Sequence, residues 1–319
     1  MPSSSAISSL LSLDVRVGDC RQLMREMPDE SVQCCVTSPP YFGLRDYGHP
    51  GQIGQEETPE AFVAAMVDVF REVRRVLKAD GTCWLNLGDS YAANRSYQVA
   101  DNKHKEVGNH MPMRVPKGLK PKDLIGIPWR VAFALQADGW YLRQDIIWAK
   151  PNPMPERVTD RCTKSHEYIF LLTKSDRYYY DADAIKEANS EDMQRRAAAG
   201  HTRGANGKVD ASRCDSDTLR GEHAKEIKAD GRNKRSVWSV PVAPFKGAHF
   251  ATYPPDLIKP CILAGSRPGD MVLDPFGGSG TTGQVALELG RRATLIELNH
   301  EYANIIDHRT NVTPGLALV

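Results

Sequence analysis

The 319-residue sequence has no Cys-x-x-Cys pair, no long apolar run and almost no net charge. The spacing of its seven cysteines indicates neither a disulfide framework nor a zinc ribbon, so no metal site is expected. No apolar stretch approaches the roughly 20 residues of a membrane span, and residues 1–13 lack the cationic start of a signal peptide. With a net charge of only +1, affinity for a polyanion must come from local basic patches. We therefore expect a cytoplasmic protein with no membrane association.

Large apolar residues are scarce between positions 185 and 235. Twelve Lys and Arg stand there against nine Asp and Glu, a composition typical of a flexible insertion or surface lobe. Strand and helix patterns alternate on both sides of it, which predicts one α/β domain in two halves, 14–184 and 236–310. A second polar segment, 90–122, carries seven Lys and Arg against two acidic residues, and we expect it to be a basic loop.

The apolar patterns predict a series of strands and helices. A helix capped by Thr58, with Pro59 in its first position, should keep one apolar face as far as Leu77. Two strands, 141–148 and 168–173, should form a hairpin near an edge of the sheet. The other expected strands are 15–17, 32–36, 83–87, 271–273 and 293–298, and the other expected helices are 20–27, 128–137, 255–264, one ending at 289 and one beginning at 300.

A short proline turn, Thr37-Ser38-Pro39-Pro40-Tyr41, follows the apolar run at 32–36. Such a run reads as a buried strand, and ligands of open α/β sheets bind at the carboxyl edge of their strands. The prolines fix two φ angles, which leaves the Ser38 hydroxyl and the Pro39 carbonyl able to accept from one NH2 group. Tyr41 adds a face for stacking a base. Alone, the turn could equally be a plain proline corner.

A glycine-rich loop, Asp274 to Gly283, lies between a predicted strand and a predicted helix. Glycines allow a ligand to approach the backbone, and a helix N-terminus offers free N–H groups to an anion. Glu297 ends the next strand, where a carboxylate can accept hydrogen bonds from a ribose diol. The loop also matches the dinucleotide fingerprint G-x-G-x-x-G, but its Asp-Pro-Phe start and the short chain beyond it disfavour a dehydrogenase. A nucleoside-containing cofactor is expected.

The two motifs together resemble those of site-specific DNA amino-methyltransferases, in the permuted (β) order of restriction-modification enzymes that methylate cytosine N4 or adenine N6. The resemblance extends from about residue 14 to 309 and includes the segments 145–151, 167–174 and 249–254. It implies S-adenosyl-L-methionine as cofactor and a Rossmann-like methyltransferase fold, α/β, with a mostly parallel twisted sheet and a hairpin edge strand. It also implies that 185–235 is an inserted target-recognition region.

For the turn, the resemblance implies a grip on the exocyclic amine of a flipped base. Ser38 and Pro39 would hold the amine in a pyramidal geometry, Pro40 belongs to the same rigid motif, and Tyr41 would hold the ring by stacking. Asp89, at the end of the strand 83–87, is the expected partner of Ser38. A strand-end cap is the equally supported alternative for Asp89.

For the cofactor, the resemblance implies two groups of contacts. The methionine end would be embraced by the loop, with Thr252 nearby, and Glu297 would accept from the ribose. Asp19 would contact the adenine amine, although it suits a helix N-cap equally well. The loop residues concerned are Asp274, Phe276, Gly277, Gly278, Gly280 and Thr281.

The expected partner is double-stranded DNA, together with a cognate restriction endonuclease that cuts the same site; no oligomeric state is inferred. Phosphate contacts are expected from Lys117, Lys120 and Lys122. Serine in the first motif position favours cytosine N4 over adenine N6 as the target. RNA methylation, a catalytically silent DNA-binding protein and a nicotinamide dehydrogenase are the alternatives. A Pro260-Cys261 nucleophile is disfavoured because Cys261 lies in the apolar pattern of a helix.

Overall fold

The computed structural model describes residues 12–44, 49, 51–92, 115, 118–191, 194–195, 231–242 and 253–310. Thr252 and Lys117 lie outside these residues. The chain divides into a larger unit, Met1–Asp181 with Ser236–Val319, and a smaller unit, Ala182–Arg235. In the smaller unit a 3-10 turn, η1 (Asp183–Ile185), is followed by a bridge that pairs Glu187 with Arg232.

The larger unit is built on one eight-stranded sheet with the order β1-β8-β7-β2-β3-β5-β4-β6. Neighbouring strands are parallel except at β5, which runs antiparallel to both β3 and β4. The strands are β1 (Leu13–Val17), β2 (Val32–Thr37), β3 (Leu77–Leu87), β4 (Tyr141–Ala149), β5 (His166–Thr173), β6 (Val237–Ser239), β7 (Met271–Asp274) and β8 (Arg292–Glu297). The predicted mostly parallel sheet with a hairpin near its edge is confirmed. The short strand β6, which the sequence did not predict, pairs outside that hairpin.

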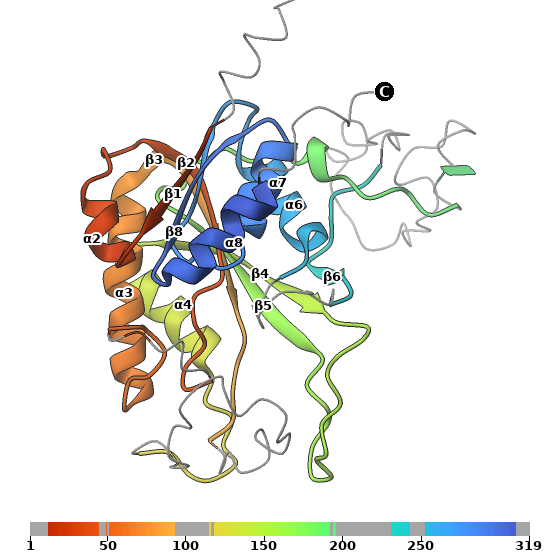
Figure 1. The fold of residues 1–319 in the computed structure, drawn as a ribbon. Coiled ribbons are helices and arrows are strands. Elements are labelled where there is room, and N and C mark those ends of the chain that lie inside the picture. Colours follow the sequence, from red (N-terminus) through yellow and green to blue (C-terminus); the bar gives the residue numbers. More distant parts are fainter. Residues whose placement is uncertain are drawn as a thin grey trace, which may run out of the picture. The chain divides into compact units, whose positions relative to one another are not determined.

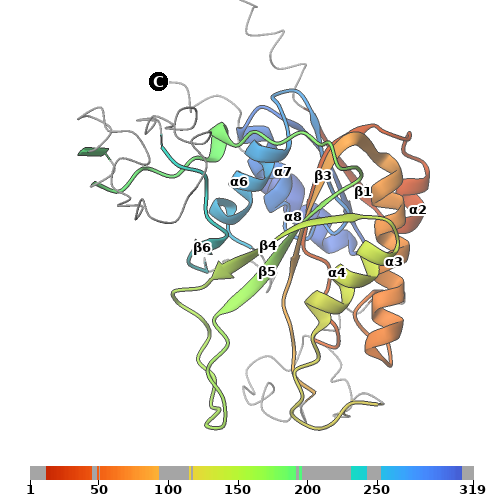
Figure 2. The same ribbon diagram turned by 180° about the vertical axis from the view of Figure 1, so that it is seen from behind.

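Helices cover both faces of the sheet (Figures 1 and 2). One face carries α2 (Cys20–Arg25), α3 (Pro59–Val76) and α4 (Ile127–Ala137), and the other carries α6 (Pro255–Gly265), α7 (Thr281–Glu288) and α8 (His300–Thr310). With helices on both sides, every residue of β2 is buried, which explains its continuous apolar character. Among the described helices none is long and apolar enough to cross a membrane.

Helix α3 shows how local sequence sets an element. Thr58 caps it by accepting a hydrogen bond from the Ala61 amide at 3.1 Å, with Pro59 at the first turn as expected. The predicted end of the helix was wrong. Leu77 has extended backbone angles and begins β3, so its burial reflects the sheet rather than the apolar face of the helix.

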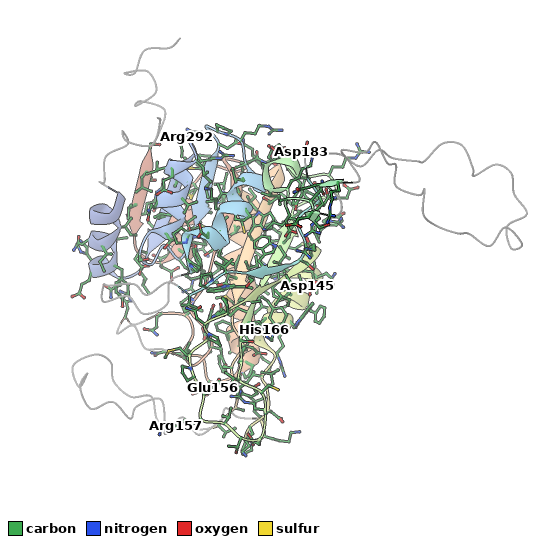
Figure 3. The ribbon with its side chains drawn as sticks, turned by 90° about the vertical axis from the view of Figure 1, so that its right-hand side faces the viewer. Asp145, Glu156, Arg157, His166, Asp183 and Arg292 are labelled. Atoms are coloured by element: carbon green, nitrogen blue, oxygen red, sulfur yellow. The ribbon has the colours of Figure 1, made fainter. Side chains whose placement is uncertain are left out.

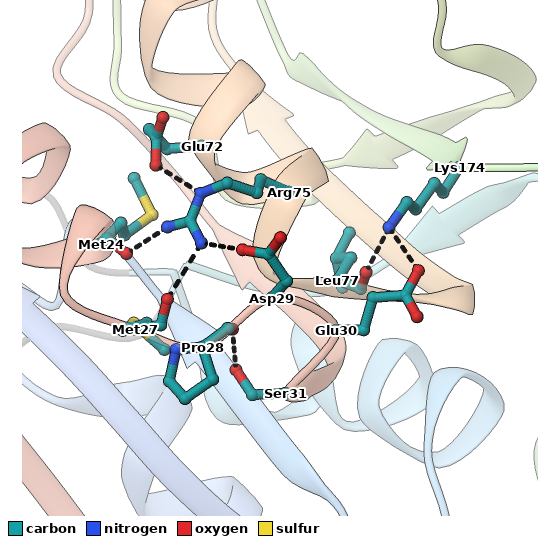
Figure 4. A network of polar contacts seen from close by, with 10 residues as sticks. All are labelled: Met24, Met27, Pro28, Asp29, Glu30, Ser31, Glu72, Arg75, Leu77 and Lys174. Carbon is teal, nitrogen blue, oxygen red and sulfur yellow. Dashed lines mark hydrogen bonds and ion pairs between the residues drawn. The ribbon is translucent and has the colours of Figure 1, made fainter.

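A polar clamp joins elements at the amino ends of β2 and β3, as Figure 4 shows. The Arg75 guanidinium donates to the carbonyls of Met24 and Met27 and pairs with Glu72 and Asp29. These bonds fix the end of α2 and the following turn against α3. The clamp therefore stabilises the edge of the sheet opposite to its carboxyl edge.

The chain order reverses between β2 and β7, which are hydrogen-bonded neighbours although more than 200 residues separate them. From β2 the chain continues to β3 on one side, and from β7 it continues to β8 on the other. Such a reversal leaves a crevice beyond the carboxyl ends of the two strands, where open α/β sheets bind their ligands. The proline turn and the glycine loop both begin there.

Candidate functional site

A cavity of about 1150 Å³, measured out to its open mouth, lies at this crevice. The two predicted motifs, which are far apart in the sequence, form its walls. The predicted residues that line it are Asp19, Ser38, Pro39, Pro40, Tyr41, Asp274, Phe276, Gly277, Gly278, Thr281 and Glu297.

The proline turn presents two acceptors to the cavity. Ser38 is half-buried and Pro39 is buried, yet neither the Ser38 hydroxyl nor the Pro39 carbonyl bonds to any residue that the structure describes. Both groups therefore remain available to a ligand that can donate.

Tyr41 packs its ring against the backbone at Gly88, the residue after β3. A Cβ atom on Gly88 would come within 2.5 Å of the ring, so only glycine allows this approach. The Tyr41 hydroxyl donates to Glu167 Oε2 at 2.6 Å and lies 3.3 Å from Asn86 Oδ1. Contacts at both ends of the side chain hold the ring in one orientation at the wall of the cavity.

Glu167 is itself held firmly. Its side chain is 12% exposed, and it forms an ion pair with Lys150 and accepts from Asn86 Nδ2 at 3.2 Å. The Lys150 ammonium also lies 4.2 Å from the centre of the Trp148 ring. Glu167 lies in the segment 167–174, for which the sequence predicts no individual role. Its contacts with Tyr41 and Asn86 arise because β5 pairs antiparallel with β3, which no local pattern indicates.

Asp89 does not partner Ser38, so that expectation was wrong. Its carboxylate accepts from the amides of Ser90, Gly126 and Ile127 at 2.9–3.1 Å, and it is absent from the cavity wall. Two of those amides belong to the start of α4, which has no side-chain cap of its own. Asp89, which is far from α4 in the sequence, thus caps the N-terminus of that helix. This role is similar to the strand-end cap that the sequence offered as the alternative.

Asp274 lies at the centre of a buried hydrogen-bond network. Its carboxylate accepts from Thr37 Oγ1 at 2.6 Å, Thr282 Oγ1 at 2.6 Å, the Tyr253 hydroxyl at 3.0 Å and the Phe276 amide at 3.0 Å. Burial raises the pKa of the Asp274 carboxyl, although these donors favour its charged form. Asp274 borders the cavity, but its oxygens are used to join β2, β7 and α7.

Glu297 closes the other side of the glycine loop. Its carboxylate accepts from the Gly278 amide at 2.7 Å and from the Asn299 amide at 2.9 Å. Burial raises the pKa of Glu297 above the ordinary range, and the two amide donors act in the opposite direction. Because a carboxylate has about four acceptor positions, it can still accept from a ligand in the cavity.

Gly280 shapes the loop and is not among the residues that line the cavity, so its expected contact with the cofactor stays a prediction. It adopts φ of +82° just before α7, and a Cβ there would lie 3.0 Å from Ile306. Both observations require glycine at a tight turn that packs against α8. After Asp274, the expected loop contacts that line the cavity are Phe276, Gly277, Gly278 and Thr281.

Asp19 lines the cavity and also caps α2. Its Oδ1 accepts from the Arg21 amide at 2.8 Å, and its carboxylate forms an ion pair with the Arg21 guanidinium at 2.5 Å. The hydrogen bond from Arg21 lowers the pKa of Asp19 below its ordinary value. The N-cap alternative is therefore what the geometry shows, and any contact with a ligand would be additional.

Several other residues of the predicted motifs and segments lie away from the cavity. Lys120 and Lys122 are exposed and pair with Asp123 at 3.4 Å and Asp160 at 2.6 Å. Trp148 is buried, with its Nε1 donating to the Val240 carbonyl at 2.8 Å. Cys261 is a buried residue of α6, as expected for a core position rather than a nucleophile.

The cavity fits S-adenosyl-L-methionine in its chemistry. Glu297 offers acceptors to a ribose diol, the start of α7 offers backbone amides to a carboxylate, and Phe276 offers an apolar surface. The unpartnered acceptors of the proline turn face the same space. The arrangement can therefore hold a nucleoside cofactor on one wall and an amine on the other.

Comparison with known proteins agrees with this geometry. Residues 32–308 match the model of a protein family described as DNA methylase. The chain is 49% identical over 95% of its length to the type II methyltransferase M.SmaI of Serratia marcescens, covering 92% of that protein. It is 48% identical over 92% of its length to M.Cfr9I of Citrobacter freundii, covering 85% of that protein.

Solved structures show the same fold. A DNA modification methylase of Thermus thermophilus, in complex with S-adenosyl-L-methionine, aligns with a TM-score of 0.56 and 25% identity, over 93% of this chain and 92% of that one. The cytosine-N4-specific PvuII DNA methyltransferase aligns with a TM-score of 0.61 and 18% identity, over 95% and 88% of the two chains.

Proposed function

The chain belongs to the DNA methylase family, and on that premise we propose that it methylates N4 of cytosine in a specific double-stranded DNA site. It is an S-adenosyl-L-methionine-dependent DNA amino-methyltransferase of the restriction-modification type, with DNA as its substrate. The choice of base and the roles of individual residues belong to the proposal.

The observation that carries the proposal is the pair of unused acceptors in the proline turn. An exocyclic amine is a poor nucleophile because its lone pair is delocalised into the ring. Hydrogen bonds from the NH2 group to Ser38 Oγ and the Pro39 carbonyl favour a pyramidal nitrogen with a localised lone pair. Bound S-adenosyl-L-methionine supplies an electrophilic methyl group. Transfer of that methyl group to the amine nitrogen would leave S-adenosyl-L-homocysteine, and the proton that the methylated amine loses would pass to water.

Tyr41 is proposed to stack on the target ring. Stacking requires a fixed ring plane, and the Glu167 carboxylate with the Gly88 backbone supplies it. Glu167 is thus a positioning residue, which acts through Tyr41. The cofactor side is proposed to use Glu297 for the ribose and the loop from Phe276 to Thr281 for the methionine end.

Cytosine is favoured by Ser38, because serine in this motif position goes mostly with N4 methylation in the family that the sequence resembles. Adenine N6 is the second candidate, since both amines offer the same hydrogens. Residues 185–235 are proposed to read the DNA site, and a cognate endonuclease to cut it.

Phosphate contacts are proposed for Lys120 and Lys122, with Lys117 beyond the described residues. Both described lysines have more than three quarters of the side chain exposed, at 83% and 79%. Replacing them with alanine should weaken DNA binding at all sequences and lower the salt slope by about 1 per contact. An unchanged slope would remove this assignment.

The proposal is tested by incubating the protein with duplex DNA and isotopically labelled cofactor, then digesting the DNA to nucleosides for mass analysis. We expect label only in N4-methylcytosine. Label only in N6-methyladenine would overturn the base assignment and keep the enzyme class. A parallel incubation with RNA completes the test: label in RNA alone, or in no nucleic acid, would overturn DNA methylation by this chain.

A further inference from the structure

The loop between β4 and β5, residues 150–165, extends from the same edge of the sheet as the proline turn. Strand β4 runs parallel to β2, so both strands end at that edge. Figures 1 and 2 show the loop projecting beyond the sheet, and Figure 3 places Glu156 and Arg157 at its far end, beyond His166. Its first residue, Lys150, pairs with the glutamate that holds Tyr41. The loop thus begins next to the wall proposed to hold the target base.

The first arm of the loop is stiffened by local chemistry. Prolines at 151, 153 and 155 each fix a φ angle. Asn152 forms two hydrogen bonds with the backbone of Val242, one to its amide at 2.8 Å and one to its carbonyl at 3.0 Å. This arm therefore presents its side chains in a defined direction.

The second arm is braced against the segments that follow β3. Asp160 pairs with Lys122 at 2.6 Å, and the Arg161 guanidinium lies 3.9 Å from the centre of the Tyr91 ring. Lys164 Nζ donates to the Asp89 carbonyl at 2.5 Å, and burial lowers the pKa of Lys164. Contacts along both arms make the loop a supported projection.

Met154 lies in this projection between two prolines and is 85% exposed. No other large apolar side chain in the described part of the chain exceeds 59% exposure. A methionine contributes nothing to the core from such a position. Its exposure on a braced loop at the catalytic edge suggests that it contacts a partner.

We propose that Met154 is an apolar wedge, which enters duplex DNA beside the target base and keeps the base pair open while the base occupies the cavity. The inference rests on the proposed function, because a paired amine cannot reach Ser38 and Pro39 unless its base leaves the stack. Flexible apolar side chains such as methionine are among those that separate base steps in this way.

Charges on the same loop fit a phosphate backbone beside the wedge. The loop carries four Lys and Arg against two acidic residues, and both acidic side chains are paired with cations. Arg157 is exposed and has no partner among the described residues. We assign Arg157 a phosphate contact, which predicts a different kind of defect from that of Met154.

The test compares Met154→Ala, Met154→Leu and Arg157→Ala on a matched duplex and on the same duplex with a mismatch opposite the target base. On the matched duplex, Met154→Ala should methylate about tenfold more slowly, whereas Met154→Leu, which keeps an apolar wedge, should resemble the wild type. On the mismatched duplex, the methylation rate of Met154→Ala should return to that of the wild type, because the target base is already unpaired. Arg157→Ala should be weakened on both duplexes, with a salt slope lower by about 1.

A Met154→Ala rate equal to that of the wild type on the matched duplex would overturn the wedge. So would a defect that the mismatch does not relieve, or an equal defect in Met154→Leu. The control is Tyr141→Ala, which should leave the methylation rate unchanged. Tyr141 is 47% exposed and lies at the start of β4, at the edge of the sheet opposite to the cavity. A wild-type protein inactive on every DNA would instead overturn the proposed function, and the wedge with it.

Discussion

The two walls of the cavity treat their hydrogen-bond acceptors in opposite ways. On the cofactor side, the Asp274 carboxylate accepts four hydrogen bonds from within the protein. On the base side, the Ser38 hydroxyl and the Pro39 carbonyl accept none from the described residues. Polar groups that bond within the protein stabilise the fold, whereas acceptors at the cavity wall that have no protein partner are available to a ligand. Asp274 is therefore expected to support the site, and Ser38 to act in it.

The largest effect on stability is expected when the Asp274 carboxylate is removed, which tests whether the cofactor-side acceptor supports the fold. Asp274→Ala would leave three buried hydroxyl groups and an amide without their acceptor, at a cost of about 3 kcal/mol or more in unfolding free energy. Thermal or urea unfolding should reveal this loss. Asp274→Asn keeps the shape and should cost less. Stability unchanged in both variants would show that the network does not support the fold.

The base-side wall is probed through Tyr41 and Glu167. Tyr41→Phe keeps the ring but removes the hydrogen bond of 2.6 Å to Glu167, and we expect methylation to slow about tenfold, since bonds to charged groups are worth roughly 1.5–3 kcal/mol. Glu167→Gln retains an acceptor and should be milder than Glu167→Ala.

A double-mutant cycle separates positioning from mere stability in this pair. If Glu167 acts through Tyr41, Glu167→Ala should add little to the defect of Tyr41→Phe, and single-turnover rates should show this non-additivity. Additive defects would mean that the two residues act independently.

A smaller effect is expected from the protonation of the Glu297 carboxylate on the cofactor side of the cavity. Burial raises its pKa, so the group gains a proton at a higher pH than an exposed glutamate. The ionised carboxylate accepts from a ribose diol through both oxygens and more strongly than the protonated form does, so cofactor affinity should fall as the pH drops from neutral through this raised pKa. Calorimetric titrations should show a weaker and pH-independent affinity in Glu297→Gln. The same pH dependence in that variant would assign the titration to another group.

The smallest expected effect concerns Asp19. Asp19→Ala removes an N-cap and should cost about 1 kcal/mol, whereas Asp19→Asn keeps a capping oxygen. Because Arg21 lowers the pKa of Asp19, the stabilisation by the charged group is complete above the ordinary aspartate pKa. It is lost as the pH falls through the lowered value. Urea unfolding at neutral and acid pH would reveal this, and an equal cost at both would contradict it.

The sequence predicted those features that depend on neighbouring residues. The Thr58 cap, the buried strand β2 and the loop before α7 follow from local propensity and pattern, and the structure contains each of them. The meeting of the two motifs was predicted because the resemblance to a family assigned both of them to one methyl-transfer site. In the structure this meeting follows from the pairing of β2 with β7, which brings the carboxyl ends of the two strands together.

What the sequence could not specify were contacts between segments that only the sheet order and strand register bring together. Asp89 was predicted to lie beside Ser38 because it follows the next strand, but its carboxylate accepts hydrogen bonds from the amides at the start of α4. Glu167 reaches Tyr41 only through the antiparallel strand β5. The same dependence on register explains why β6 and the end of α3 at Val76 were missed.

The central claim, that the unused acceptors of the proline turn serve the reacting amine, is tested most directly by Ser38→Ala. In this variant the cofactor dissociation constant should equal that of the wild type. The single-turnover methylation rate should be lower by about 100-fold or more, as for loss of one preorganised polar contact to a reacting group. The unfolding free energy should equal that of the wild type, in contrast to Asp274→Ala. An unchanged rate, or a loss explained wholly by weaker cofactor binding or by unfolding, would contradict the account.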